Sequence, residues 1–342
     1  MPIDDVLFIH YQWDMPPPLT CLLRRSYDPA ALLANHPPRW RHPYKQLVFD
    51  LACPACARHR GTIVLTRWAA AELPDAVALE PTEAVDLPGY YDYRAPSDAV
   101  WHVNFADPQL FVAYGSRLLA QDELQAAEHP LLGCLREALV AENQPALTED
   151  DHGPTPVLVQ GVERRCAIDT APNLDAGRVY GLYGNRFAQA SADQVRSAVR
   201  ALEPPGRTNL ISIAAPVGSG PYWPAQLRRI LVTAYTGFAA AVAESRQAWP
   251  QAATEVRTGF WGCGAFGGNR HAMTLLQLLA ARLARVDRLT FYTFDEAGRD
   301  AFRTGARQLD QVVSAGAPGE PLAALLERVA DLDYQWGTSD GN

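Results

Sequence analysis

From residue 100 onward, short runs of apolar residues alternate with longer segments whose apolar positions recur every three or four residues. The short runs predict strands at 100–106, 157–161, 209–216, 255–259 and 289–294. The longer segments predict helices at 116–141, 192–202, 224–245, 269–285 and 297–314. Strands that alternate with helices of this length indicate an α/β domain with helices on both faces of a sheet. Such a sheet binds its ligand at the carboxyl ends of its strands.

The first 95 residues show no such alternation. Proline is dense there, as in "MPPPL" and "HPPRWRHP", and breaks the chain into short elements. Two apolar segments on either side of "CPAC" predict a hairpin at 46–66. We therefore expect two regions, an irregular N-terminal accessory region at 1–95 and the α/β domain at 96–342.

The composition excludes some classes of function. With 342 residues, of which 48% are hydrophobic, the chain can bury a substantial core. A formal charge of −8 and a pI of about 5.5 argue against general binding to nucleic acids or anionic membranes, which requires a basic surface. No apolar run is long enough to cross a bilayer, and the first residues lack a basic segment followed by an apolar one. We expect a soluble protein of the cytoplasm.

The cysteines do not indicate a disulfide framework or a metal site. They are Cys21, Cys53, Cys56, Cys134, Cys166 and Cys263. Only the pair in "CPAC" is close in sequence, and zinc would need two more ligands from distant positions such as His36 or His42. A turn that carries two reduced thiols is the simpler interpretation, so we expect neither a metal nor a cofactor.

The segment "TGFWGCGAFGG" at 258–268 carries the clearest chemical signal. It places five glycines between a predicted strand and a predicted helix. Gly262, Gly264 and Gly267 fit the pattern G-x-G-x-x-G, but only one more strand follows, which is too few for a dinucleotide-binding fold. Glycines permit close approach of the backbone, and a helix N-terminus attracts anions, so this loop can hold a diphosphate. A tight turn that serves packing alone is the other interpretation.

The same segment resembles a loop in the macrodomain of the poly(ADP-ribose) glycohydrolase family, where it reads T-G-N-W-G-C-G-A-F-G-G. Every position matches except Phe260, where the family has asparagine. The likeness extends upstream to "LRRILVTAYTGFAAAV" and downstream to "LLQLLAA" and "LTFYTF". The resemblance implies that the loop contacts ADP-ribose through Phe260, Gly262, Cys263, Gly264, Ala265, Phe266 and Gly267. Phe294 would pack near the adenosine or ribose, although burial in the sheet explains it equally well.

A second signature of the family is a glycine triplet followed by Q-E-E. It aligns without a gap with "VNFADPQLFVAYGSRLLAQDELQ" at 103–125. Gln121, Asp122 and Glu123 occupy the Q-E-E positions, whereas residues 111–113 (Phe-Val-Ala) replace the glycines. We expect the bulky side chains at 111 and 112 to reshape the contact with the ligand.

Two more departures from the family affect the same region. Asn104 stands where the family has aspartate, and Asp107 replaces an asparagine that contacts the distal ribose in the family. Asp107 can be a plain turn residue, or it can bond the ribose or pair with a cationic leaving group. Taken alone, "QDEL" is equally typical of a solvated first helical turn, where acids are favoured.

An ADP-ribosyl bond breaks at the anomeric carbon through an oxocarbenium-like transition state, which requires a nearby carboxylate and an acid for the leaving group. Asp122 and Glu123 can supply both. The resemblance therefore implies a three-layer α/β/α macrodomain with a mixed sheet over 96–342. It makes Asp122 and Glu123 catalytic and places Gln121 and Asp107 on the substrate.

The function that the resemblance implies is a hydrolase that removes ADP-ribose from modified proteins. The acidity of Asp107 and Asp122 favours mono-ADP-ribosylated arginine over the polymer. Cleavage of poly(ADP-ribose), non-catalytic binding of ADP-ribose and an unrelated nucleotide-binding fold are the alternatives. Tyr180 and Tyr183 are two candidates for a tyrosine that covers the ligand. The sequence leaves the oligomeric state open.

Overall fold

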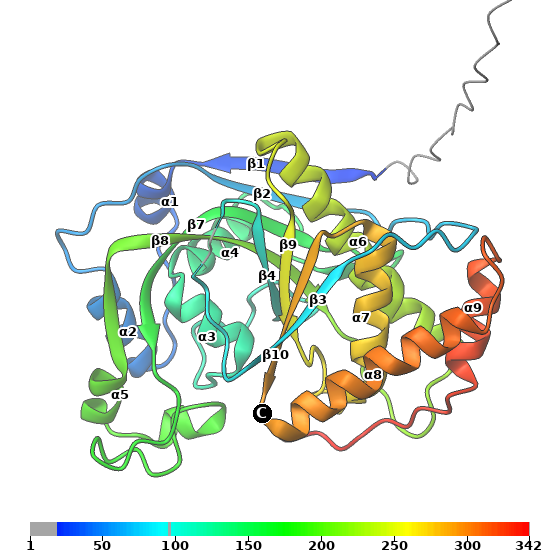
Figure 1. Cartoon of the computed structure of the whole chain (residues 1–342). Coiled ribbons are helices and arrows are strands. Elements are labelled where there is room, and N and C mark those ends of the chain that lie inside the picture. Colours follow the sequence, from blue (N-terminus) through cyan, green and yellow to red (C-terminus); the bar gives the residue numbers. More distant parts are fainter. Residues whose placement is uncertain (1–18, 95–96, 342) are drawn as a thin grey trace, which may run out of the picture.

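One mixed sheet of eight strands forms the centre of the molecule (Figure 1). The computed structural model describes residues 19–94 and 97–341. The strands are β1 (Cys21–Tyr27), β2 (Ile63–Trp68), β3 (Glu83–Pro88), β4 (Val100–Ala106), β7 (Val157–Ile168), β8 (Val199–Ala214), β9 (Glu255–Gly259) and β10 (Arg288–Phe294). Their order in the sheet is β1-β2-β7-β8-β4-β9-β10-β3. The strands from β8 to β3 run parallel, whereas β1, β2 and β7 pair antiparallel.

Helices cover both faces of the sheet. They are α1 (Pro29–Asn35), α2 (Pro43–Ala52), α3 (Gln121–Glu128), α4 (Leu131–Ala141), α5 (Ala192–Ala198), α6 (Pro224–Ala248), α7 (Arg270–Ala284), α8 (Glu296–Ser314) and α9 (Leu322–Ala330). A short hairpin of β5 (Glu149–Asp150) and β6 (Gly153–Pro154) and a 3-10 helix at Asn185–Gln189 lie outside the main sheet.

The side chains of β8 alternate between the two faces of the sheet and contact the helices on both of them. Ile211 and Ile213 pack in one apolar cluster with α6 and α7, whereas Leu210 packs in a second cluster with α1 and α4. Successive residues of a strand point to opposite faces of its sheet, so a continuous apolar run serves both layers. The predicted three-layer α/β/α architecture with a mixed sheet is confirmed.

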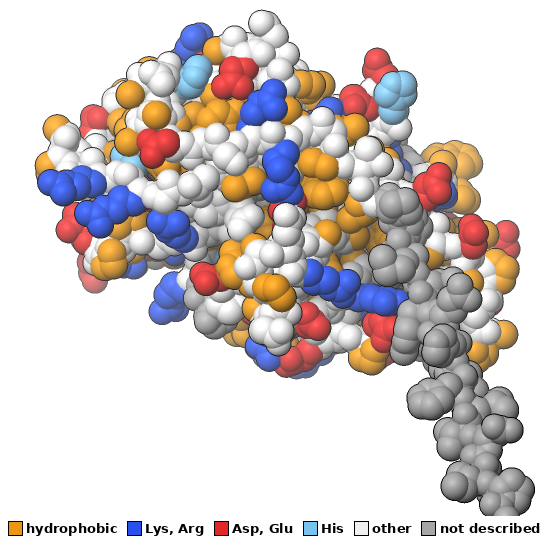
Figure 2. All heavy atoms as spheres, turned by 90° about the horizontal axis from the view of Figure 1, so that it is seen from above, with side chains coloured by type: hydrophobic (Ala, Val, Ile, Leu, Met, Phe, Trp, Pro, Cys, Tyr) orange, Lys and Arg blue, Asp and Glu red, His pale blue; other side chains and the backbone are white. Residues whose placement is uncertain are grey.

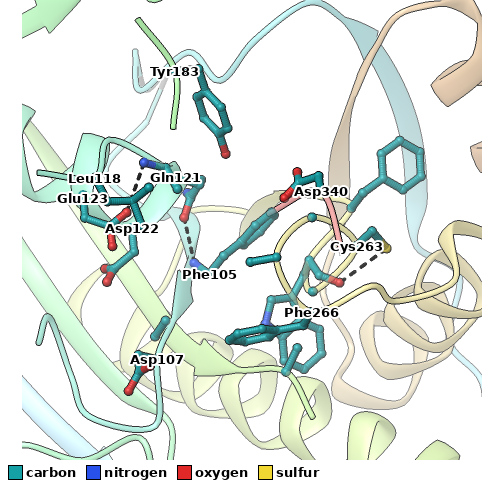
Figure 3. A pocket seen from close by; sticks show the side chains of 18 of the residues that line it. Phe105, Asp107, Leu118, Gln121, Asp122, Glu123, Tyr183, Cys263, Phe266 and Asp340 are labelled. Carbon is teal, nitrogen blue, oxygen red and sulfur yellow. Dashed lines mark hydrogen bonds between the residues drawn. The ribbon is translucent and has the colours of Figure 1, made fainter. Parts of the chain in front are cut away.

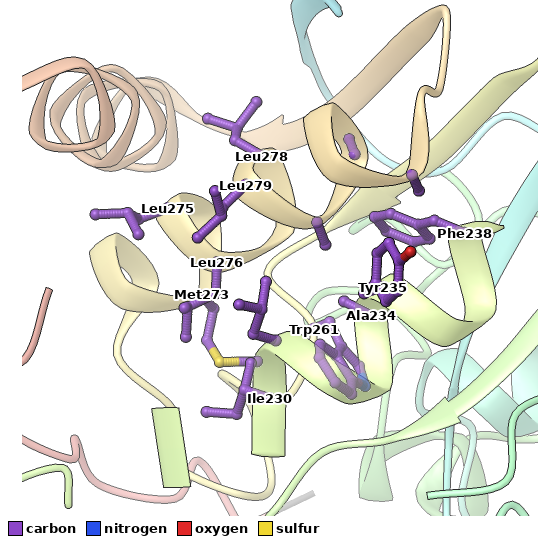
Figure 4. Close-up of a cluster of buried hydrophobic side chains, with 14 of the residues drawn as sticks. Ile230, Ala234, Tyr235, Phe238, Trp261, Met273, Leu275, Leu276, Leu278 and Leu279 are labelled. Carbon is purple, nitrogen blue, oxygen red and sulfur yellow. The ribbon is translucent and has the colours of Figure 1, made fainter. Parts of the chain in front are cut away.

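Helix α7 is apolar on nearly every side and lies between α6 and α8 (Figure 4). All four leucines between positions 275 and 279 are buried. A helix of this kind belongs inside the protein rather than on its surface. Trp261, in the loop before α7, is fully buried and donates a hydrogen bond of 3.0 Å from Nε1 to the carbonyl of Ile213. These contacts fix both the helix and the loop that precedes it.

Several predicted boundaries are wrong for identifiable reasons. Pro130 divides the helix predicted at 116–141, since proline interrupts the helical hydrogen bonds, and α3 begins only at Gln121. The helix predicted at 192–202 ends at Ala198, because β8 begins at the next residue and pairs with β7. The first half of β8 is largely exposed and therefore lacks the apolar pattern that would reveal a strand.

The hairpin predicted at 46–66 is also wrong. Its first half belongs to α2, and its second half to β2, which pairs with β1 and β7. Pro43 occupies the first helical position, where its fixed φ suits a helix. Nδ1 of His42 accepts a hydrogen bond of 3.3 Å from the N–H of Tyr44 and so caps the helix. Val48 and Ala52, four positions apart, bury the same face.

The region before residue 96 is integrated into the sheet. Strands β1 and β2 form one edge of it, and β3 forms the other edge beside β10. The boundary between an accessory region at 1–95 and a macrodomain at 96–342 stays a prediction. Within the described residues, no helix is long and apolar enough to span a membrane. Acidic and basic side chains are interspersed over the face seen in Figure 2.

Candidate active site

A cavity of about 530 Å³ opens at the carboxyl ends of the parallel strands. Asp107 follows β4, Ala215 follows β8, Phe260 follows β9, and Phe294 ends β10; all four line the cavity. Side chains that are distant in sequence therefore meet here because parallel strands end at the same edge. The cavity lies where the α/β pattern predicts a ligand.

The first turn of α3 forms one wall (Figure 3). Gln121 holds this turn against β4, because its Oε1 accepts a hydrogen bond of 2.8 Å from the N–H of Phe105 and its Nε2 donates one of 3.0 Å to the carbonyl of Val103. Gln121 lines the cavity, yet its amide is engaged with the strand, and its predicted contact with a substrate stays a prediction. Gln121 orients the acids that follow it.

Asp122 and Glu123 both line the cavity and are only 7% and 5% exposed. Oδ1 of Asp122 accepts a hydrogen bond of 2.9 Å from Nδ2 of Asn104. Oε2 of Glu123 reaches back to accept one of 3.1 Å from the N–H of Ala120, at the start of the helix. The two adjacent carboxyls, referred to below as the acid pair, are thus held by different partners.

Burial decides the ionisation of the acid pair. Burial, followed by the charge of Glu123, raises the pKa of Asp122 to about 7, although the hydrogen bond from Asn104 opposes the shift. Burial also raises the pKa of Glu123, against the nearby charge of Lys45. Like charges this close resist double ionisation. Near neutral pH the pair can offer one protonated and one ionised carboxyl.

The glycine loop forms the opposite wall, with Cys263 and Phe266 facing the acid pair across the cavity in Figure 3. Gly262 has a φ of 74°, and a Cβ at this position would lie 2.5 Å from Cβ of Ala215. Gly267 has a φ of 65°. Only glycine adopts a positive φ of this size without strain, so the glycines at these two positions permit the sharp turns of the loop.

The loop presents main-chain donors to the cavity. In the part of the chain that the structure describes, the N–H groups of Gly264, Ala265 and Phe266 find no acceptor. Successive unpaired N–H groups in a turn form a concave site for anions. The N–H groups of His271 and Ala272, in the first turn of α7, are not available for this purpose, because Oδ1 of Asn269 accepts a hydrogen bond from each of them. The loop, rather than the helix end, supplies the donors.

Arg270 adds a positive charge beside these donors. It lines the cavity, and its guanidinium carbon lies 4.8 Å from the centre of the Phe260 ring. A cation in the first turn of a helix opposes the helix dipole. An anion bound beside Arg270 would offset this unfavourable interaction. A basic residue at the start of a predicted helix is therefore the sequence signal that would have identified Arg270.

A segment near the C-terminus crosses the glycine loop. The N–H of Gly337 donates a hydrogen bond of 2.7 Å to the carbonyl of Gly267, and the N–H of Asp340 donates one of 3.4 Å to the carbonyl of Gly264. The side chain of Asp340 enters the cavity between Tyr183 and the loop (Figure 3). Trp336, which stacks on Tyr222 at 4.2 Å, anchors this segment.

Nearly all of the site residues predicted from the sequence meet in the cavity. The predicted residues that line it are Asp107, Gln121, Asp122, Glu123, Phe260, Gly262, Cys263, Gly264, Ala265, Phe266 and Phe294. Gly267 does not line the cavity and contacts the C-terminal segment instead. Of the two candidate tyrosines, Tyr183 lines the cavity, whereas Tyr180 does not and is 72% exposed.

The residues in place of the glycine triplet behave differently from what we expected. Phe111 is fully buried in the second apolar cluster, and Ala113 is the member of the three that lines the cavity. The bulk at position 111 therefore lies outside the lining of the cavity. Its φ of 52° is unusual for a residue with a side chain, so the turn keeps a backbone conformation that favours glycine.

Several other residues that line the cavity could not be identified from the sequence. Tyr90 and Tyr91 come from the chain after β3, and Phe105 comes from β4. Asp340 arrives from the far end of the chain. Aromatic residues in such segments show no periodicity that distinguishes a ligand contact from core packing, so only the fold reveals their place.

Comparison with known proteins gives one family model that matches part of the chain. Residues 192–300 match a family model described as "Poly (ADP-ribose) glycohydrolase (PARG), Macro domain fold". Among solved structures, poly(ADP-ribose) glycohydrolase from Thermomonospora curvata is 16% identical over 82% of this chain and 85% of that chain, with a TM-score of 0.40. The enzyme from Deinococcus radiodurans in complex with ADP-ribose is 16% identical over 84% and 95%, with a TM-score of 0.42. The segment matched by the family model includes the glycine loop but not the acid pair.

Proposed function

We propose, from the premise that residues 192–300 belong to a macrodomain of the poly(ADP-ribose) glycohydrolase family, that this chain is an ADP-ribosyl hydrolase. It removes ADP-ribose from modified proteins by cleaving the bond at the anomeric carbon of the ribose. The observation that carries this proposal is that the acid pair and the glycine loop face one cavity from opposite walls.

The loop wall supports binding of a diphosphate. Three consecutive N–H donors at 264–266 and the guanidinium of Arg270 offer the charge and geometry that phosphate oxygens accept. The volume of about 530 Å³ lies in the range of cavities that enclose small organic ligands. A diphosphate held on this wall would direct the attached ribose towards the acid pair.

The cavity wall that carries the acid pair has the groups that hydrolysis requires. The protonated carboxyl gives its proton to the leaving atom as the bond between that atom and the anomeric carbon breaks. The ionised carboxyl stabilises the positive charge that develops on the ribose and takes a proton from the attacking water. A new bond forms between the water oxygen and the anomeric carbon, and the proton count balances. Asp122 and Glu123, with their pKa values raised by burial, match this division of roles.

Protein-linked ADP-ribose, and arginine-linked ADP-ribose in particular, is the substrate that we favour over the polymer. Asp107 lines the cavity next to the acid pair, with Oδ1 accepting a hydrogen bond of 2.8 Å from the N–H of Gln109. Its carboxylate adds negative charge where the leaving group would lie. A guanidinium leaving group would be attracted to this negative charge, whereas a neutral ribose hydroxyl would be stabilised less by it.

A panel of substrates tests the proposal. Purified protein is incubated with proteins that carry ADP-ribose on arginine, glutamate or serine, and with poly(ADP-ribose). Free ADP-ribose released fastest from the arginine-linked substrate supports the proposal in full. Release from polymer alone would make the chain a poly(ADP-ribose) glycohydrolase. Tight binding of ADP-ribose with no release from any substrate would leave a non-catalytic binding protein.

A further inference from the structure

Lys45 is the only lysine of the chain; the other 29 of its 30 basic residues are arginines. This lysine lies in α2 and is 1% exposed. It shares the buried face of the helix with Val48 and Ala52, at positions where an apolar side chain would be expected. A buried ammonium is costly unless other groups compensate it, so its surroundings require an explanation.

The ammonium of Lys45 lies close to the first turn of α3. Nζ donates hydrogen bonds to the main-chain carbonyls of Tyr114, at 3.0 Å, and of Glu123, at 3.4 Å. It also lies 5.8 Å from the centre of the Phe187 ring. Among the described residues, no carboxylate is within ion-pairing distance of Nζ. Lys45 therefore ties the turn before α3 to the residue that carries one of the two acids.

Electrostatics link Lys45 to the acid pair beyond these hydrogen bonds. Burial lowers the pKa of Lys45 to about 8, while the charges of Glu123 and Asp122 oppose the shift. The positive charge acts in return to lower the pKa of both acids, against burial. Lys45 is thus mainly charged at neutral pH and favours an ionised member of the pair.

We propose that Lys45 is a positioning residue for the acid pair: its ammonium fixes the main chain at Tyr114 and Glu123, and its charge keeps one of the two carboxyls ionised in the cavity. This inference depends on the proposed function only in that the pair is catalytic. It also gives the region before residue 96 a part in the site, because α2 supplies the charge.

Other charged groups surround the pair and must be considered with Lys45. Arg41 lies before α2 and opposes the charge of Lys45, and Asp107 after β4 opposes ionisation of both acids. His42 lies near Lys45, and Arg117 lies near His42. Tyr183, which also lines the cavity, lies near Glu123 and Asp340. Among these groups, Lys45 is the fully buried cation.

Two substitutions separate the charge of Lys45 from its hydrogen bonds. Lys45→Gln keeps a donor for the carbonyls but removes the charge, and Lys45→Met removes both. An opposite charge at short range lowers the pKa of an acid by about one unit or more, so both variants should shift the acidic limb of the pH–rate profile upward by about one unit. Lys45→Met should also unfold at a lower temperature than Lys45→Gln. A lysine that only fills space would leave the profile unchanged in both variants, which would overturn the proposal.

The single lysine allows a second test that does not use catalysis. Protein labelled with ¹⁵N-lysine gives one Nζ resonance, whose titration reports the pKa of Lys45 directly. The variants Glu123→Gln and Asp122→Asn each remove one negative charge, and the first should lower this pKa by about one unit. Glu327→Gln, an exposed substitution on α9, is the control and should leave it unchanged. The same pKa in all four proteins would overturn the proposal even if Lys45→Met failed to fold.

The two tests also separate this inference from the proposed function. A wild-type protein that hydrolyses no ADP-ribosylated substrate contradicts the proposed function. The Nζ titration still decides whether Lys45 and the acid pair are coupled, because it needs neither substrate nor activity.

Discussion

Nδ2 of Asn104 donates a hydrogen bond of 2.9 Å to Oδ1 of Asp122, and this contact joins the end of a central strand to the first turn of the helix that carries the acids. Gln121 adds two hydrogen bonds to the backbone of the same strand. The position of the acid pair is therefore fixed by β4, and its neighbour in the sheet, β9, leads into the glycine loop. Changes to either wall of the cavity should have distinct effects on binding and on catalysis.

Removing either acid should abolish hydrolysis while ADP-ribose still binds. General acid–base catalysis contributes about 100- to 10,000-fold to a rate, so Asp122→Asn and Glu123→Gln should each lower kcat by at least about 100-fold. Calorimetric titration should give an affinity for ADP-ribose close to that of the wild type. Glu327→Gln serves as the control for both measurements. Substantial activity in both variants would exclude the acid pair as the catalytic groups.

Asp122 should make the protein less stable as the pH rises from about 4 to about 7. Its pKa is raised to about 7 by burial, so over this range the native state keeps a proton that the unfolded state releases. The free energy of unfolding then falls with increasing pH, by about 1.4 kcal/mol for each unit of difference in pKa. Asp122→Asn should flatten the dependence of Tm on pH and raise Tm at pH 7. The exposed Asp175→Asn is the control, and an equal slope in all three proteins would contradict the prediction.

Arg270→Gln should weaken binding of ADP-ribose. The guanidinium stands at the cavity wall next to the donors of the glycine loop, and a hydrogen bond to a charged group contributes about 1.5–3 kcal/mol. The dissociation constant should therefore rise by roughly 10- to 100-fold, which titration calorimetry can measure. The control is Arg307→Gln, an exposed arginine on α8. An unchanged affinity would mean that the diphosphate does not lie on this wall.

Asp340→Asn should have the opposite effect on affinity. A Cβ at Gly264 would lie 3.1 Å from Oδ2 of Asp340, so this carboxylate stands next to the donors expected to hold a diphosphate. Two like charges repel, and salt screens the repulsion. Removal of the charge should tighten binding of ADP-ribose in dilute buffer and do so less at high salt. Asp331→Asn, at an exposed position, is the control and should bind ADP-ribose like the wild type. Weaker binding by Asp340→Asn would contradict the prediction and would show that the carboxylate of Asp340 contacts the ligand favourably.

The sequence was most informative where a local pattern and a buried position coincide. The bounds predicted for β4 and β9 are those observed; both strands are short and largely buried. The glycine loop was recognisable because its backbone conformation tolerates few residues other than glycine. The acid pair could be connected with this loop only through the family resemblance, since 135 positions separate Glu123 from Thr258 at the start of the loop segment.

Where the structure differs from the predictions made from the sequence, tertiary contacts determine the structure. α2 resembles a strand in composition, yet a proline start and a cap make it a helix. Gln121 carries a side chain that suits a ligand but uses it on β4. Lys45 and Asp340 enter the site region from opposite ends of the chain, and no local pattern encodes such an approach.

The pairing of β3 with β10 has a consequence for how the chain is made. Arg288 lies beside Glu83, 205 positions earlier, and their side chains form a hydrogen bond of 2.9 Å. At a translation speed of about 5–20 residues per second, β3 leaves the ribosome roughly 10–40 s before its partner exists. Until then its edge is unprotected, so nascent chains that end before β10 should be a preferred substrate for chaperones.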